Sequence, residues 1–283
     1  MKIGTCIRGN YLLEDLENAV AAGFDTVELY FNERLGNIDW KETTKQMKEV
    51  IGDSGVTISG IGLYCNPLID EDAQRELQDC IENAHLLGTD FIGTFAGAVS
   101  GKSVEDSLPQ FKKVFSELVQ AAEYHDVQIG IENAHMYGHW YHTTCNIGFC
   151  PRAWEMMFHE VDSDRLGLEW EPSHQLALLI DPIAQLRNWM PKIFHVHGKD
   201  ARINSEHISQ YGIWFGEHYC VHCFPGTGDS DWAEIIDTLR KGGYQRDISI
   251  EGYHDPVYCG EREQEGQRLA LSYLRKAANV SSH

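Results

Sequence analysis

The sequence predicts an α/β fold, specifically a (β/α)8 TIM barrel that forms one domain over residues 1–283. Three observations support this prediction. Strand-like and helix-like segments alternate along the chain, as they do in proteins with a parallel sheet. They form eight pairs within 283 residues, which matches a (β/α)8 barrel. No Gly-x-Gly-x-x-Gly motif is present, so a doubly wound sheet is the second choice.

The first four strand–helix pairs lie in the N-terminal half of the chain. Gly23 and Gly88 stand where two of the expected helices end, as C-cap glycines do. In order, the expected elements are strand 2–7, helix 12–24, strand 26–31, helix 39–55, strand 57–64, helix 72–88, strand 90–97 and helix 103–125.

The C-terminal half repeats the same scheme. Within several expected strands, apolar residues alternate with small or polar residues. Because successive side chains of a strand point to opposite faces, the apolar face would meet the helices and the polar face would meet the barrel axis. In order, the expected elements are strand 127–134, helix 151–161, strand 166–172, helix 182–190, strand 193–200, helix 232–244, strand 248–253 and helix 265–277.

The composition argues against nucleic acid and membranes as partners. The chain has 23 basic and 43 acidic residues, a formal net charge of -20, which repels phosphate backbones and anionic lipid surfaces. No apolar run is long enough to span a bilayer, and the first residues, MKIGTCIRGN, do not resemble a signal peptide. We therefore expect a cytoplasmic protein.

The eight cysteines show one compact pattern, CVHC at residues 220–223. A single CxxC motif is weak evidence for zinc, although Cys259 and His222 would supply further ligands. We favour the alternative, in which these residues are ordinary thiols of a reducing compartment.

Four consecutive expected strands, the fifth to the eighth, end with an inward acid or imidazole. These residues are Glu132, Glu171, His197 and Glu251. Active sites of (β/α)8 barrels lie at the carboxyl ends of the strands, and neighbouring strands are about 5 Å apart. The four side chains can therefore meet at one point, and the sequence predicts that they do.

This residue set predicts a metal site. Three carboxylates alone in a dry barrel mouth would repel one another, and a divalent cation would remove that repulsion. Three oxygen ligands and one imidazole suit Mn²⁺, Mg²⁺ or Co²⁺ better than a structural Zn²⁺. We therefore expect one divalent ion, with Mn²⁺ as the first choice and Mg²⁺, Co²⁺ or Zn²⁺ as alternatives.

Further candidates lie beside these four residues. His195 and Lys199 share the inward face of strand 193–200 with His197. His195 is expected either to support a ligand or to contact substrate, and Lys199 is a candidate substrate contact. Glu169 is interpreted as a salt-bridge partner and left out of the metal set. His174 is favoured as a substrate contact over a helix-capping role, and His135 is also a candidate substrate contact.

The connection at 201–231 is long for a strand-to-helix loop, and long ordered loops are often functional. It is rich in aromatic residues, among them Trp214, which suit stacking on a sugar ring or on an aglycone. A hydrophobic flap packed on its own barrel, or on a second subunit, is an equally favoured interpretation.

The motifs GIENAH, EPSH, HVHGKDA, PGTGDSDWAEI and SIEG resemble those of the xylose isomerase-like barrels. This family includes sugar isomerases and epimerases, inosose dehydratases and the endonuclease IV proteins, and the resemblance covers nearly the whole chain. It implies Glu132 and Glu251 as metal ligands that also move protons, and Glu171 and His197 as ligands. The family usually has Asp where this chain has Glu171.

The resemblance also implies a substrate-contacting role for His174 and, by a looser match, for Arg202. It further implies pairing of barrels through their mouth-covering loops. We therefore expect a homo-oligomer, either a dimer or a tetramer.

These features predict a divalent-metal-dependent sugar isomerase or epimerase. A carboxylate would remove a proton next to a carbonyl, giving an enediolate that the metal stabilises. The substrate would be a small sugar or glycoside. The first alternative is a dehydratase, or a lyase that cleaves 3-oxo-glycosides and works with a small partner subunit. A non-catalytic binding barrel is a more remote alternative. An AP endonuclease is also remote, because that branch of the family needs extra histidine ligands and the third and fourth strands contain none.

Overall fold

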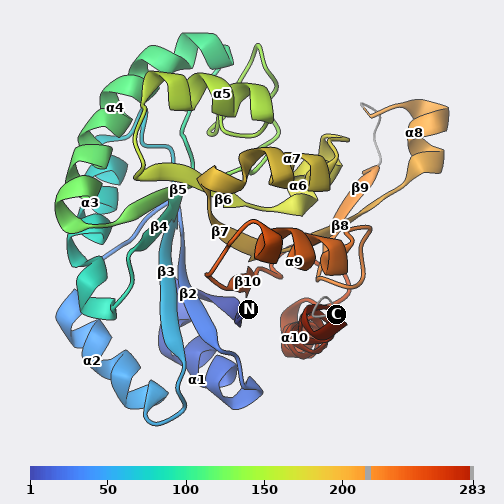
Figure 1. The fold of residues 1–283 in the computed structure, drawn as a ribbon. Coiled ribbons are helices and arrows are strands. Elements are labelled where there is room, and N and C mark those ends of the chain that lie inside the picture. The colour runs from blue at the N-terminus through green and yellow to red at the C-terminus, as the bar shows by residue number, and fades with distance from the viewer. Residues whose placement is uncertain (214–217, 281–283) are drawn as a thin grey trace.

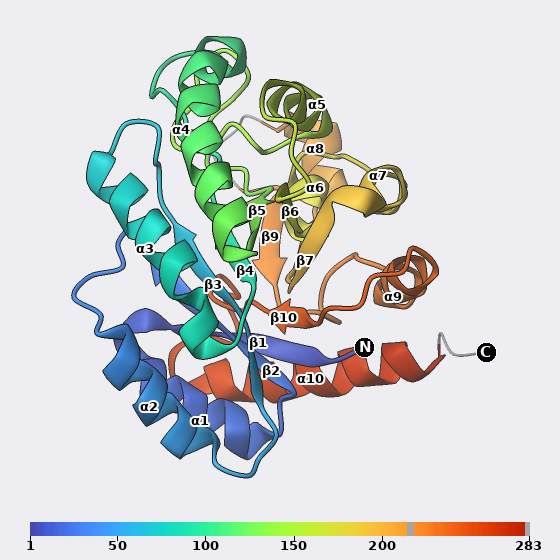
Figure 2. The same cartoon turned by 60° about the vertical axis from the view of Figure 1, so that its left-hand side comes forward.

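Parallel strands close into an eight-stranded barrel in the computed structural model, which describes residues 1–213 and 218–280. Around the ring the order is β1, β10, β7, β6, β5, β4, β3 and β2, and β2 pairs with β1 to complete it. Helices surround this ring on its outside (Figures 1 and 2). The predicted TIM barrel is therefore confirmed.

Each predicted barrel strand is present, although some are shorter than expected. The strand predicted at 90–97, for example, is limited to four residues. The barrel strands are β1 (Ile3–Arg8), β2 (Thr26–Asn32), β3 (Thr57–Tyr64), β4 (Phe91–Thr94), β5 (Gln128–Glu132), β6 (Leu166–Trp170), β7 (Ile193–Gly198) and β10 (Ile248–Ile250).

The helices begin and end at residues that favour helix termini. The Asp39, Asp70 and Ser103 side chains accept hydrogen bonds from backbone N–H groups in the first turns of their helices. Gly23 and Gly88 adopt the left-handed conformation at C-caps, as the sequence indicated. The outer helices are α1 (Leu12–Ala22), α2 (Trp40–Ile51), α3 (Glu71–Leu87), α4 (Val104–His125), α5 (Pro151–Glu160), α6 (Pro172–Ala177), α7 (Pro182–Trp189), α9 (Trp232–Lys241) and α10 (Glu263–Val280), and three short 3-10 helices occupy Gly9–Tyr11, Met190–Lys192 and Gly260–Arg262.

The connection between β7 and α9 has more structure than the loop expected at 201–231. It contains β8 (Asp200–Ile203), helix α8 (Ser205–Tyr211) and β9 (Cys220–Cys223), and β8 pairs with β9 as an antiparallel hairpin. The hairpin projects from the barrel and ends in α8 (Figure 1). Its strands are too short and too polar for their pattern to stand out in the sequence.

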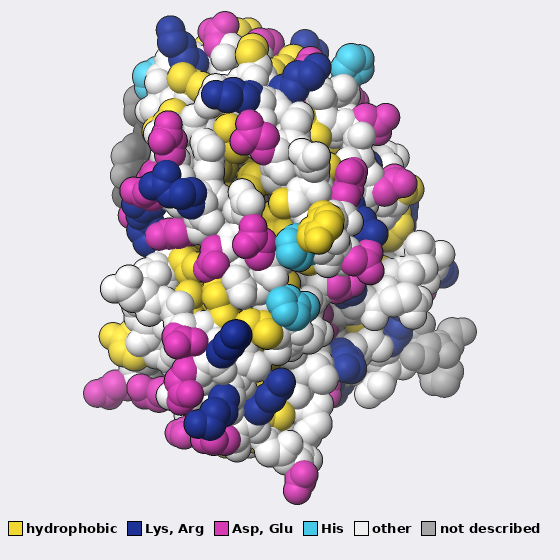
Figure 3. Space-filling model, turned by 90° about the vertical axis from the view of Figure 1, so that its left-hand side faces the viewer, with side chains coloured by type: hydrophobic (Ala, Val, Ile, Leu, Met, Phe, Trp, Pro, Cys, Tyr) yellow, Lys and Arg dark blue, Asp and Glu magenta, His cyan; other side chains and the backbone are white. Residues whose placement is uncertain are grey.

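The apolar core lies between the barrel and its helices, and the outer helix faces are polar. Figure 3 shows the side of α2, α3 and α4, where acidic and basic side chains are interspersed and apolar side chains form small patches. Among the described residues, no helix combines the length and the apolar character needed to span a membrane. The barrel interior, in contrast, contains several buried acids and histidines.

Candidate metal centre

Four side chains from neighbouring strands converge near the carboxyl ends of those strands. Glu132 ends β5, Glu171 follows β6, His197 lies on β7 and Glu251 follows β10. One ligand atom from each lies within 4.8 Å of the others, and all four residues are buried. His197 Nδ1 is 3.1 Å from Glu132 Oε1, 3.5 Å from Glu251 Oε2 and 3.8 Å from Glu171 Oε2. We call these four residues the mouth cluster.

The donors of the mouth cluster fit a divalent cation. Three carboxylates and one imidazole form a set that suits Mn²⁺, Mg²⁺ or Co²⁺. Among the described residues, Glu171 Oε2 has no hydrogen-bond partner although it is buried. Leaving a buried acceptor unpaired costs about 1–3 kcal/mol, and a cation at this point would satisfy it.

Protonation of the mouth cluster differs from one carboxyl to the next. Burial raises the pKa of Glu132 to about 8 and that of Glu251 to about 7, although His197 and Lys199, respectively, act in the opposite direction. Burial would also raise the pKa of Glu171, but the charge of Lys199 holds it well below its usual range. Glu171 is therefore ionised at neutral pH, while Glu132 and Glu251 exchange protons there.

Metal affinity is expected to increase as pH rises through about 7 and about 8, because Glu251 and Glu132 must lose protons before they bind a cation. His197 must also lose a proton, because burial lowers its pKa but Glu169 and Glu28 raise it well above its usual value. The free energy of unfolding of the metal-free protein should instead fall as pH rises. The pKa values of Glu132 and Glu251 in the folded protein exceed the ordinary value of 4.5. Their contribution to the free energy of unfolding is therefore fully present below pH 4.5 and is lost as pH rises through about 7 and 8. Calorimetric titration with Mn²⁺ at several pH values tests this, and a pH-independent affinity would contradict it.

Lys199 lies beside the mouth cluster and contacts two of its carboxylates. Its Nζ is 2.9 Å and 3.0 Å from the two carboxylate oxygens of Glu251 and 3.7 Å from Glu171 Oε2. Burial would lower the pKa of Lys199, but Glu171 and Glu251 raise it above its usual value. The ammonium group therefore stays charged and offsets part of the negative charge of the site.

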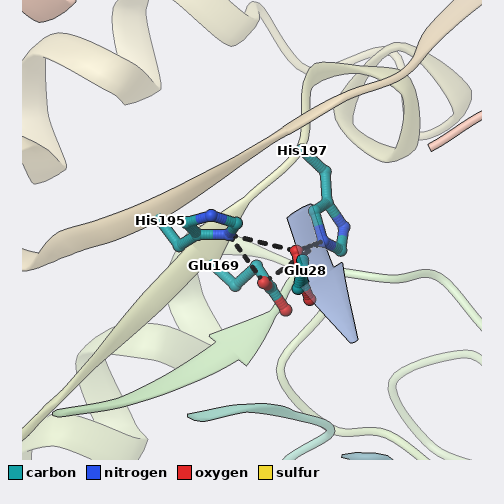
Figure 4. A group of neighbouring side chains, drawn as sticks. All are labelled: Glu28, Glu169, His195 and His197. Carbon is teal, nitrogen blue, oxygen red and sulfur yellow. Dashed lines mark hydrogen bonds and ion pairs between the residues drawn. The ribbon is translucent and has the colours of Figure 1, made fainter. Parts of the chain in front are cut away.

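A second group of ionisable side chains lies on the other side of the His197 ring (Figure 4). Glu28 of β2 and Glu169 of β6 place carboxylate oxygens 3.0 Å and 3.2 Å from His197 Nε2. The Tyr64 hydroxyl is 2.8 Å from Glu28 Oε1 and 2.9 Å from Glu169 Oε2. Together with His195, we call Glu28, Glu169 and His197 the axial cluster. Its carboxylates keep a proton on Nε2, so Nδ1 is the ring atom available to a metal.

Two glycines provide the space for the axial cluster. A Cβ at Gly93 would lie 2.5 Å from Glu169 Oε2. A Cβ at Gly62 would lie 2.6 Å from the Tyr64 hydroxyl and 2.7 Å from Glu28 Oε1. Real Cβ atoms do not approach other atoms so closely, so a side chain at either position would displace a carboxylate. Inward glycines of β3 and β4 therefore leave room for the inward acids of β2 and β6.

His195 lies deeper in the barrel than His197. Its Nδ1 is 2.9 Å from Glu169 Oε1, its Nε2 is 3.5 Å from Asp247 Oδ1, and its ring stacks on Phe91 at a centroid distance of 4.7 Å. Burial lowers its pKa, but Glu28 and the other acids nearby raise it to about 9. The side chain is 0% exposed, and its ring nitrogens face Glu169 and Asp247, an environment that suits the supporting role. Glu169 forms ion pairs with both histidines, as expected of a salt-bridge partner.

The other predicted site residues differ in their distance from the mouth cluster. His174 is buried beside the mouth cluster, with Nε2 3.4 Å from Glu171 Oε1. His135 donates its backbone N–H to His174 Nδ1 at 3.2 Å, while its own ring bonds the Gly138 carbonyl. Arg202 is exposed on β8, away from the buried clusters. Trp214 lies outside the described residues.

The CVHC motif does not form a zinc site with Cys259. Cys259 is exposed, and its Sγ contacts the Pro256 carbonyl at 3.7 Å. Within residues 1–213 and 218–280, the groups of side chains close enough to hold a metal consist of Glu and His alone.

Three members of the buried network were missed by the sequence analysis: Glu28, Tyr64 and Asp247. A signal for Glu28 was present, because it alternates with the apolar residues Val27 and Leu29 and so faces the axis. A single acid in an apolar strand nevertheless gives no indication of its partners.

The chain is similar in sequence to known dehydratases. The chain is 27% identical over 293 residues to a 3-dehydroshikimate dehydratase from Pseudomonas putida. The aligned region covers 98% of this chain and 42% of that protein. The chain is 25% identical over 122 residues to an inosose dehydratase from Lacticaseibacillus casei, which covers 42% of this chain and 40% of that protein. The chain thus spans about two fifths of the length of these relatives.

The fold also matches a solved structure. The 3-keto-D-glucoside 4-epimerase from E. coli superposes with a TM-score of 0.71 at 17% identity, over 98% of this chain and 99% of that one. The sequence profile of the xylose isomerase-like TIM barrels matches residues 16–277. The chain therefore belongs to the xylose isomerase-like TIM barrel family.

Proposed function

We propose that this chain is a divalent-metal-dependent dehydratase that acts on a polyhydroxylated ketone. The observation that supports this most directly is the convergence of three carboxylates and one imidazole in the mouth cluster. The similarity to two dehydratases that act on cyclic ketones favours elimination of water over isomerisation, which was the first expectation from the sequence.

The mouth cluster has suitable groups for removing a proton next to a carbonyl. A divalent cation held by Glu132, Glu171, His197 and Glu251 would polarise the carbonyl and lower the pKa of the neighbouring C–H bond. Glu132 or Glu251 would accept that proton, because each is a buried carboxylate of the mouth cluster and a carboxylate can act as a general base. The hydroxyl group on the next carbon would then leave as water by taking up that proton, which forms the carbon–carbon double bond and returns the carboxyl to its ionised state.

His174 is suited to contact the substrate at this site. Its Nδ1 accepts the backbone N–H of His135, so Nε2 carries the ring proton. Burial holds the pKa of His174 well below its usual range, so the ring is neutral. A neutral Nε2–H beside Glu171 can donate a hydrogen bond to a substrate oxygen.

An epimerase is the second candidate, and the order of the strands favours it. Around the barrel, β7 and β6 lie between β10 and β5, so Glu251 and Glu132 flank the other two ligands. Two proton-transfer groups on either side of a substrate can remove a proton from one face and return it to the other.

Proton NMR in D₂O tests both candidates with the metal-loaded protein. The panel comprises 3-dehydroshikimate, an inosose, simple ketoses and a 3-keto-glucoside, with chelator-treated protein as the control. Deuterium exchange next to the carbonyl together with loss of water supports the dehydratase, and exchange with inversion alone supports the epimerase. Release of an aglycone would indicate the 3-oxo-glycoside lyase. Absence of exchange with every ketone would contradict enolisation chemistry.

A further inference from the structure

The CVHC segment reaches the metal centre through His222. This residue lies on β9 of the projecting hairpin, opposite Ala201 of β8. Its Nδ1 is 3.0 Å from the Ser173 hydroxyl, and its ring centroid is 4.9 Å from that of His174. Ser173 is fully buried, and its hydroxyl donates a hydrogen bond to Glu171 Oε1. A residue of the inserted hairpin is thus two hydrogen bonds away from a mouth-cluster carboxylate.

The direction of these two hydrogen bonds follows from the groups involved. A carboxylate that binds a metal ion is ionised, so Glu171 in this role only accepts hydrogen bonds. The Ser173 hydroxyl therefore donates its one hydrogen to Glu171 Oε1. The Ser173 oxygen then acts as the acceptor toward His222, which must donate from Nδ1–H. The relay runs from His222 through Ser173 to Glu171.

We propose that His222 is a positioning residue for Glu171, an inference that rests on the metal centre of the proposed function. A glutamate side chain has one more rotatable bond than an aspartate, so its carboxylate needs a fixed partner to keep one orientation. The relay holds Oε1 and leaves Oε2, which has no hydrogen-bond partner among the described residues, facing His197 Nδ1 and Lys199 Nζ. Mutating a residue that holds a metal ligand through hydrogen bonds typically lowers metal affinity by about 10–100-fold.

The test compares His222→Ala and His222→Asn with the wild-type protein. Co²⁺ affinity is measured by competition with a chelator, and the visible absorption spectrum of bound Co²⁺ reports ligand geometry. His222→Ala should bind Co²⁺ about 10–100-fold more weakly, with a changed spectrum. His222→Asn should recover most of both properties, because its side-chain amide can still donate to Ser173. Val221→Ala, on the same strand but on its other face, is the matched control and should resemble wild type.

Circular dichroism and thermal unfolding confirm that each variant is folded. Wild-type affinity and spectrum in His222→Ala would overturn the proposal and leave the metal centre intact. Equal weakening in His222→Ala, His222→Asn and Val221→Ala would also overturn it, because a general loss of hairpin packing would then explain the effect. Failure of the wild-type protein itself to bind Co²⁺ would refute the metal centre and this inference together.

Discussion

Replacing Glu132 with Gln is expected to lower kcat by about 10²–10⁴-fold on the substrate that the NMR panel identifies, as the loss of a general base does. Glutamine keeps the size of the side chain but cannot accept a proton at neutral pH. Glu251→Gln should give a loss of similar size, because both carboxyls titrate near neutrality. The measurement is steady-state turnover, together with deuterium exchange into the substrate.

The metal content of each variant must be measured with its activity. Activity lost while the ion is retained assigns the residue to proton transfer, whereas loss of both assigns it to metal binding. Glu160→Gln is a suitable control, since Glu160 forms an ion pair with Lys112 on the exterior of the barrel. Turnover of Glu132→Gln within a few-fold of wild type would contradict the proposed role.

Replacing His195 with Leu is expected to lower the free energy of unfolding by about 3–5 kcal/mol, as the loss of one partner from a buried ion pair does. The imidazolium lies between Glu169 and Asp247 and is 0% exposed. Leucine would leave these two carboxylates without their shared cation. Equilibrium urea unfolding of the metal-free protein measures the change.

Asp237→Asn provides the control for this experiment. Asp237 pairs with Lys241 at 2.6 Å on the outer surface of α9, where Lys241 is exposed and Asp237 is half-buried. Exposed pairs contribute about 0–1 kcal/mol, so this variant should unfold nearly as wild type does. If His195→Leu were no more destabilising than Asp237→Asn, the axial cluster would not be an ion-pair network.

Strand parity explains why much of the site was predictable. Alternation of apolar and polar residues shows which face of a strand is turned inward. Residues at the carboxyl ends of the strands lie at the end of the barrel where active sites are found. These two rules were enough to bring Glu132, Glu171, His197 and Glu251 together, as the structure places them. The same rules placed His195 and Lys199 on the inward face.

Depth along the barrel axis was not predictable, because it depends on the pairing register of neighbouring strands. His195 pairs with Glu169 where the register between β6 and β7 shifts, so it lies in the deeper layer. The hairpin was also missed, since β8 and β9 are four residues each and are separated by α8. Its contact with Ser173 is a tertiary contact that no local pattern encodes.

Metal content per chain tests the central claim most directly. Wild type and His197→Ala are incubated with Mn²⁺, freed of unbound ion by gel filtration and analysed by mass spectrometry. His139→Ala, which changes an exposed histidine, is the control. The account predicts about one ion per chain in wild type and in the control, and almost none in His197→Ala. No ion in wild type, or equal retention in His197→Ala, would contradict it.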